Sequence, residues 1–118
     1  MKLSKNQKLI LYSLGCFYQS INQSLNEKHL QLMVSKITFI ESILNSKIIS
    51  KKERALYKDI ESLEEKKLIE YDQKKIRFSE QGLKELQRIE KEVKCFIELN
   101  NYFKSVNKTK RKLQTIIN

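Results

Sequence analysis

The chain has 118 residues, of which 40% are hydrophobic and 32% charged, and its formal net charge is +10 at pH 7. This length suits one domain, and the composition favours a folded, soluble protein over a disordered one. No stretch approaches the roughly 18 apolar residues of a transmembrane helix, so we expect no membrane partner and no signal peptide. The excess of cations favours a polyanionic partner, nucleic acid first, although a generally lysine-rich composition would also produce it.

The first predicted element is a helix over about 5–21. Ser4-Lys5-Asn6-Gln7 fits the capping box, in which two side chains satisfy backbone donors at a helix start. Apolar residues then recur with helical spacing at Ile10, Leu14, Phe17 and Ile21. Gly15 lies inside this helix and indicates close packing there. Residues 22–26 are polar and predict a turn.

The next segment, 29–34, has two interpretations. Leu30, Leu32 and Val34 alternate as in a very short strand, but the same residues could begin a helix. We favour the strand. Ser35 is placed to cap a helix that ends at Asn45-Ser46-Lys47, and the two following residues, Ile48 and Ile49, are expected to be buried.

Residues 50–67 predict a third helix. Ser50-Lys51-Lys52-Glu53 fits a second capping box, and Leu56, Ile60 and Leu63 share one face. Its cations gather in and just before the N-terminal half, where the helix dipole would favour acids. Local stability does not explain this placement of Lys47, Lys51, Lys52, Arg54 and Lys58.

A short hairpin follows. We expect a strand over 68–72, a turn formed by Gln73-Lys74-Lys75, and a return strand over 76–79 in which Ile76 and Phe78 share a face. Lys74, Lys75 and Arg77 then lie at the tip and on the outer face.

A long helix is predicted from Ser79 to about Val106. It carries a heptad seam with a polar residue at an a-type position: Leu86, Ile89, Val93, Phe96, Asn100 and Phe103. The seam predicts dimerisation, and the alternative is packing against the first helix of the same chain. Residues 107–118 form a basic tail containing Lys108, Lys110, Arg111 and Lys112, frayed or helical.

A mostly α chain in which a helix leads into a basic hairpin and then into another helix is typical of a winged helix-turn-helix. Two stretches carry a closer resemblance: residues 55–69, which read ALYKDIESLEEKKLI, and Phe78-Ser79-Glu80-Gln81-Gly82. They resemble the recognition helix, wing and wing-closing turn of regulators of the PadR and MarR type. Lys67 stands where those families carry a glycine, and the hairpin is shorter than a typical MarR wing. We therefore expect a winged domain over 1–82, a long helix over 83–106 and the tail.

The resemblance implies a homodimeric, double-stranded-DNA-binding transcriptional regulator, with the helix of about 51–67 in the major groove and the wing of 72–77 on the backbone. From the residues themselves, Arg54 suits a base contact because guanidinium bonds guanine bidentately. Tyr57 could donate to a phosphate or lie half-buried against the domain. The candidate DNA-binding residues are Lys47, Lys51, Lys52, Arg54, Tyr57, Lys58, Lys74, Lys75 and Arg77. The alternatives are a winged-helix protein-interaction module and, less favoured, RNA binding.

An enzyme is not expected. The sole histidine is His29, adjacent Glu64 and Glu65 face apart on a helix, and two glycines cannot form a phosphate-binding loop. Cys16 and Cys95 lack the close spacing of zinc ligands. We expect reduced thiols, no metal or cofactor, and a cytoplasmic protein that associates with the nucleoid if it binds DNA.

Overall fold

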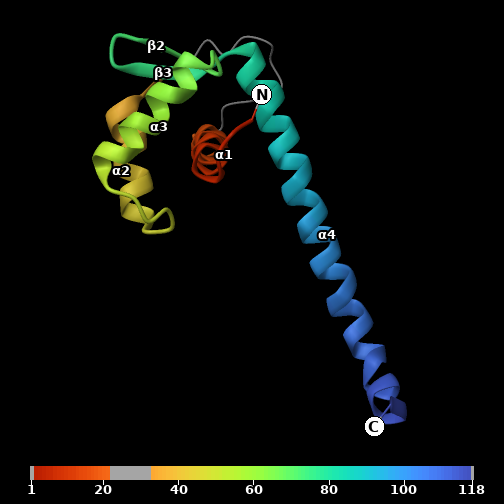
Figure 1. The fold of residues 1–118 in the computed structure, drawn as a ribbon. Coiled ribbons are helices and arrows are strands. Elements are labelled where there is room, and N and C mark those ends of the chain that lie inside the picture. Colours follow the sequence, from red (N-terminus) through yellow and green to blue (C-terminus); the bar gives the residue numbers. More distant parts are fainter. Residues whose placement is uncertain (1, 22–32, 118) are drawn as a thin grey trace. The chain divides into compact units, whose positions relative to one another are not determined.

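A computed structural model describes residues 2–21 and 33–117, with side chains as far as residue 106. Its elements are, in chain order, α1 (Lys5–Ser20), β1 (Val34–Ser35), α2 (Lys36–Ser46), α3 (Glu53–Glu65), β2 (Ile69–Asp72), β3 (Lys75–Phe78) and α4 (Glu80–Ile117). The described chain is mostly helical, and its small antiparallel sheet has β3 between β1 and β2 (Figure 1). It divides inside α4 into two compact units, Met1–Gln87 and Arg88–Asn118.

Helix α1 begins as the sequence predicts. Gln7 N donates to Ser4 Oγ at 3.1 Å, and Ser4 N donates to Gln7 Oε1 at 3.0 Å, so the capping box is confirmed. The expected close packing at Gly15 is also confirmed. A Cβ built there would lie 3.0 Å from the Cδ atoms of Leu86, in the first part of α4.

The strand interpretation of residues 29–34 is confirmed at Val34 alone, since β1 is Val34–Ser35 and Met33 lies outside it. Val34 pairs with Ile76, so β1 joins the hairpin as a third strand. Residues 22–32, including His29, lie outside the described residues. Ser35 caps α2, because its Oγ accepts from Thr38 N at 3.2 Å.

Two predictions between α2 and α3 are wrong. Ile49 is buried, but Ile48 is 80% exposed, because neighbouring residues in a non-helical loop project to different sides. The second capping box is absent. Helix α3 begins at Glu53 rather than at 51, and Lys52 occupies the N-cap position without a side-chain hydrogen bond. Glu53 instead supplies an acid to the first turn, where the helix dipole favours one.

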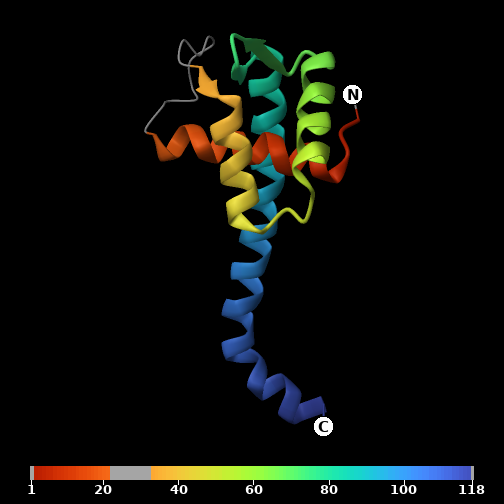
Figure 2. The same ribbon diagram turned by 90° about the vertical axis from the view of Figure 1, so that its left-hand side faces the viewer.

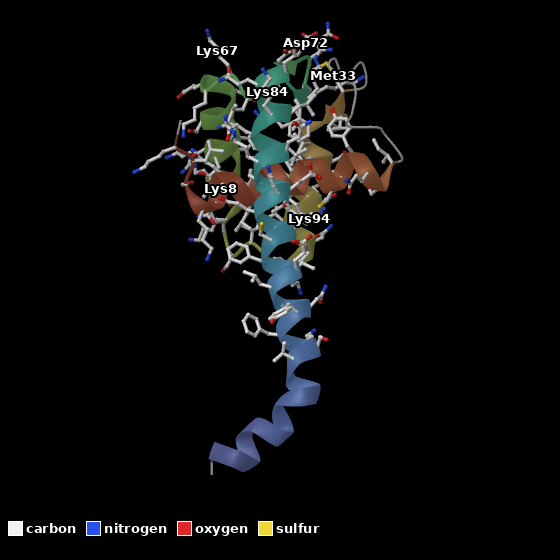
Figure 3. All side chains as sticks on the ribbon, turned by 90° about the vertical axis from the view of Figure 1, so that its right-hand side faces the viewer. Lys8, Met33, Lys67, Asp72, Lys84 and Lys94 are labelled. Carbon is white, nitrogen blue, oxygen red and sulfur yellow. The ribbon has the colours of Figure 1, made fainter. Side chains whose placement is uncertain are left out.

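The C-terminal end of α3 is a Schellman motif. Leu68 N donates to Leu63 O at 3.0 Å and Lys67 N donates to Glu64 O at 2.9 Å. Lys67 has φ 62, in the left-handed region that favours glycine. A lysine therefore adopts at this position the conformation that a helix-ending glycine would adopt, and its exposed side chain is labelled in Figure 3.

The hairpin has a two-residue loop rather than the expected three-residue turn. Gln73 and Lys74 have φ 48 and 65, as a type I′ turn requires, while Lys75 already pairs with Asp72 as the first residue of β3. Ile76 and Phe78 are both buried, which confirms that they share the inner face. The right-handed twist of a paired ribbon favours this turn even without Asn-Gly at its centre.

The core of the unit Met1–Gln87 joins the three short helices, the sheet and the first turns of α4. The side chains with no exposed surface come from every helix of this unit except α4 and include Ile10, Leu14, Ile40, Leu56, Ile60, Leu63 and Ile76. Phe17 meets Phe39 edge-on at 5.8 Å between ring centroids, which joins α1 to α2.

The start of α4 is held against the base of the hairpin. Ser79 Oγ accepts from Gly82 N at 2.9 Å and donates to Lys67 O at 2.6 Å, while Ser79 N donates to Leu68 O at 3.1 Å. A Cβ at Gly82 would overlap the Leu68 carbonyl oxygen. Glycine is therefore required here by close backbone approach rather than by an unusual φ.

Helix α4 continues past the predicted boundary near Val106 to Ile117, so of the two alternatives for the tail the helical one is confirmed. The predicted seam along it divides into two parts. Leu86 and Ile89 are buried, and Leu86 packs on α1, as the single-chain alternative expected. Phe96, Asn100 and Phe103 are exposed, and Val93 is half-buried. The backbone of residues 107–117 is helical, and their side chains lie outside the described part of the chain.

Candidate nucleic-acid interface

Helix α3 presents one stripe of charged residues to solvent. Leu56, Ile60 and Leu63 are buried on its inner face. Arg54, Lys58, Glu61 and Glu65 follow at spacings of four, three and four and are all exposed. The stripe is basic in the first half of the helix and acidic in the second, so only the N-terminal half suits a polyanion.

The predicted cations at this end of α3 differ in their partners. Lys51 Nζ lies 3.1 Å from Asp59 Oδ2, so its charge is already paired. Lys47, Lys52, Arg54 and Lys58 are exposed, and within the part of the chain that the structure describes none of them forms an ion pair. Long, exposed cations without intramolecular partners lose little when they bind phosphate.

The hairpin contributes two further cations at its tip. Lys74 and Lys75 are exposed. Arg77 instead faces Glu70 across the strands, and its Nη2 and Nε each lie 2.8 Å from Glu70 Oε2. Its charge is therefore largely compensated, unlike the charges of the two lysines at the tip.

Sequence reasoning missed a lysine that lies between α2, α3 and β2. Lys36, the first residue of α2, has its Nζ 3.2 Å from Glu64 Oε1, 4.6 Å from the ring centroid of Tyr71 and 5.7 Å from that of Tyr57. Its backbone N–H donates to Lys74 O at 3.1 Å. The side chain thus joins α2, α3 and β2 through an ion pair and cation–π contacts.

Lys36 also clarifies the two interpretations of Tyr57. The Tyr57 ring is half-buried beside the ammonium group, so it packs against the domain rather than extending freely into solvent. No sequence signal marks Lys36, because its partners lie in α3 and β2, distant in the sequence, and come together only in the folded unit.

The elements that carry these groups lie on one side of the unit Met1–Gln87. Figure 2 shows α2, α3 and the hairpin turned toward the viewer, with α1 crossing behind them. Both ribbon views place the hairpin beside the C-terminal end of α3. The cations around the start of α3 are therefore separated from the hairpin by Glu61, Glu64 and Glu65, of which Glu64 is neutralised by Lys36.

Beneath the hairpin, Tyr18 connects α1 to the sheet. Its hydroxyl donates to Ile76 O at 3.4 Å, and its ring lies 5.8 Å from that of Phe78. Burial raises the pKa of the Tyr18 phenol to about 12, although the nearby Arg77 guanidinium acts in the opposite direction. The phenol therefore stays protonated and keeps its hydrogen bond well above neutral pH.

Other kinds of site find no support in the described residues. Those residues contain no group of three or more His, Cys, Asp or Glu side chains that could hold a metal ion. Cys16 and Cys95 are both free and exposed. None of the described helices has a segment both long and apolar enough to cross a bilayer.

A scan against protein-family models, a search of curated proteins and a search of solved structures each found no match to this chain. The resemblance to PadR and MarR regulators therefore remains a prediction from the residues that carry it.

Proposed function

We propose that this chain is a DNA-binding transcriptional regulator of the winged helix-turn-helix kind, with α3 as its recognition helix and the β2–β3 hairpin as its wing. The observation that carries the proposal is the exposed cluster of Lys52, Arg54 and Lys58 at the start of α3. These cations form no ion pair with the chain's own described acids, and Lys52 and Arg54 lie at the start of the helix, where the dipole favours negative charge. Binding a polyanion accounts for both features.

The order of elements supports the same proposal. A strand, two helices and a hairpin follow α1, and the strand pairs with the second strand of the hairpin. A winged helix-turn-helix has this arrangement, in which the second helix of the pair enters the major groove. Arg54 would then read a guanine, whereas Lys52 and Lys58 would contact phosphates, with Lys47, Lys74 and Lys75 as outer phosphate contacts.

Lys51 and Arg77 are weaker members of this interface. Each is paired with a carboxylate, at 3.1 Å and 2.8 Å respectively, and would have to exchange that partner for a phosphate. The protein would act as a homodimer through the exposed part of the α4 seam, because two α3 helices can then read two half-sites.

The test is a titration of a fluorescent DNA duplex of mixed sequence at several salt concentrations. Each neutralised phosphate contributes about 0.9 to the slope of log affinity against log salt. The double variant Lys52→Glu and Lys58→Glu should bind far more weakly and lower that slope by about 2. Unchanged affinity in this variant would exclude α3 as the DNA-contacting element.

The matched control makes the same change of charge elsewhere. Lys91 and Lys94 are exposed on α4 (Figure 3 labels Lys94), so Lys91→Glu with Lys94→Glu should leave binding almost unchanged. Arg54→Lys distinguishes recognition of the base sequence from electrostatic attraction to the phosphates. It retains the charge but loses the bidentate fork, and should lower discrimination between preferred and mixed sequence by about tenfold or more.

A second function, a winged-helix module that binds another protein, is favoured by one observation. Glu61 and Glu65 are exposed on the same stripe as the cations, and they would repel a phosphate backbone that followed the whole helix. A partner with charges of both signs would suit this stripe better. This alternative would be favoured if the protein did not bind the duplex at low salt and if the α3 and α4 double lysine variants gave the same result as the unmodified chain.

A further inference from the structure

The distal part of α4 exposes large apolar side chains. Phe96 is 70% exposed and Phe103 is 58% exposed, and both recur on one side of the helix. Two more large residues, Ile97 and Leu99, flank this surface, whereas the exposed Tyr102 lies toward the side of the helix that carries Glu98. We call Phe96, Ile97, Leu99 and Phe103, together with Val93 and Asn100 between them, the distal face.

The distal face is large for a surface left in water. Aromatic side chains bury about 150–250 Å² each when covered, so two aromatic and two aliphatic residues at this exposure present roughly 400 Å². That matches the largest apolar patch found on a typical monomer, and it is about half of the roughly 800 Å² that each partner buries in a standard interface. The distal face is therefore large enough to form the apolar centre of an interface.

The polar residues around the distal face restrict what covers it. Residues 89–106 contain three Lys and three Glu, so this stretch carries no net charge within a chain of net charge +10. The excess of cations that would attract nucleic acid, an acidic protein or an anionic bilayer begins only at Lys108, beyond the distal face. Because positive and negative side chains are equal in number on this stretch, two copies of it do not repel each other.

Asn100 supplies the second argument. It occupies an a-type position, seven residues after Val93, with Phe96 and Phe103 at the flanking d-type positions. A covered asparagine amide needs hydrogen-bond partners, and a second amide provides both a donor and an acceptor. In an antiparallel pair it would face phenylalanine, and its polar atoms would be buried without partners.

We propose that the distal face is covered by the α4 helix of a second copy of this chain, packed parallel and in register, with Asn100 facing Asn100 of the other copy. This proposal rests on the proposed homodimer and adds its orientation and register. Ile97 and Leu99 occupy the e and g positions, where charged residues usually set the orientation. Asn100 is therefore the polar residue that selects the alignment.

The experiment uses cysteine cross-linking in the full chain, with Cys16→Ser and Cys95→Ser to remove the native thiols. In a parallel, in-register pair, Asn100→Cys brings two identical thiols within disulfide reach, which requires Cα atoms less than about 7 Å apart. Glu98→Cys, on the opposite side of the helix, is the matched control. Mild oxidation should give about tenfold more covalent dimer from Asn100→Cys than from Glu98→Cys.

A second seam position keeps Asn100 intact. Phe103→Cys should cross-link as efficiently as Asn100→Cys, since a parallel pair aligns every seam residue with itself. Residues 98, 100 and 103 are all exposed in the single chain, so these changes leave the fold of Met1–Gln87 in place, which circular dichroism verifies. Low yield at both seam positions in a protein of dimeric mass would overturn the parallel register while leaving the homodimer intact.

Light scattering on the unmodified chain separates the remaining outcomes. A mass of twice 14.1 kDa that falls to 14.1 kDa in Phe96→Ser with Phe103→Ser supports the proposal. A monomeric mass, with the distal face captured by neutral or anionic vesicles, would overturn it, and so would a mass of four chains. None of these results depends on DNA, so the duplex titration tests the proposed regulator separately.

Discussion

Both units of this chain contain helices with an apolar stripe, but the stripe is buried in the first unit and exposed in the second. In Met1–Gln87 the apolar stripes of α1, α2, α3 and the start of α4 are buried, as Leu83 and Leu86 illustrate. In Arg88–Asn118 the stripe continues along the same helix, but Phe96 and Phe103 are exposed. Sequence periodicity shows that one face of a helix is apolar. Which surface packs against that face depends on the other elements of the fold.

The largest effect is expected where the start of α4 meets the hairpin. Gly82→Ala should destabilise the unit Met1–Gln87 by about 3 kcal/mol or more, because the added methyl overlaps a backbone carbonyl that cannot move aside. Urea unfolding followed by circular dichroism measures the change.

The matched control for that change is Gly15→Ala. There the nearest atoms to the added methyl belong to the side chain of Leu86, and alanine also favours the helix by up to about 1 kcal/mol. A smaller loss for Gly82→Ala than for Gly15→Ala would contradict the close approach between Gly82 and Leu68.

The comparison between the units can be tested directly along α4. Leu86→Ala should lower the free energy of unfolding by about 2–5 kcal/mol, because it leaves a cavity in a closed core. Phe103→Ala removes a larger side chain but should leave the unfolding of Met1–Gln87 unchanged in dilute solution. Amide exchange of α1 and the hairpin distinguishes the two variants, and equal effects would show that the distal stripe also stabilises the first unit.

An intermediate, pH-dependent effect is expected at Tyr18. Below pH 10, Tyr18→Phe should cost about 1 kcal/mol for the lost hydrogen bond to Ile76 O. The folded pKa of about 12 lies above the ordinary 10.0, so between these values the unfolded chain ionises first and the tyrosine's contribution falls as pH rises. The difference between wild type and variant should therefore approach zero by pH 11.

Urea titrations of both proteins at pH 8 and pH 11 measure this difference. The contributions of the lysines and of the other tyrosines cancel in the comparison, because both proteins contain them. A gap that stays constant between the two pH values would mean that Tyr18 ionises equally readily in the folded and unfolded chains.

The smallest effect is expected at Lys67. Lys67→Gly should raise stability by about 0.5–1 kcal/mol, because glycine adopts the left-handed conformation without the clash of a Cβ. Lys66→Gly is the comparison, since Lys66 has φ −77 and its Nζ donates to Gln7 Oε1 at 2.9 Å. That variant should be destabilised, and a thermal melt should separate the two in opposite directions.

Local features of this fold were accessible from the sequence. Short-range chemistry determined the capping box of Ser4 and Gln7, the cap at Ser35, the inward pair Ile76 and Phe78, and the turn at Ser79 that begins α4. These features depend on residues two to four apart, and steric and hydrogen-bonding rules act at that range.

The sequence does not determine where every helix begins and ends, because similar local patterns can lead to different structures. Ser50 and Ser4 each begin a capping-box pattern, but the loop of residues 47–52 buries Ile49 and starts α3 later, so only Ser4 forms the box. The sequence likewise left open whether the tail after Val106 is frayed or helical, because continuation of a helix depends on the sum of many small preferences rather than on one stop signal.

The candidate site shows the same division. The sequence by itself determined where the cations are and that Leu56, Ile60 and Leu63 turn the other side of α3 inward. Only the tertiary structure decided which cations are paired: Lys51 with Asp59, Arg77 with Glu70, and Lys36 with Glu64. Charge is a property of each residue, whereas an ion pair requires two side chains to meet, and folding alone determines which ones do.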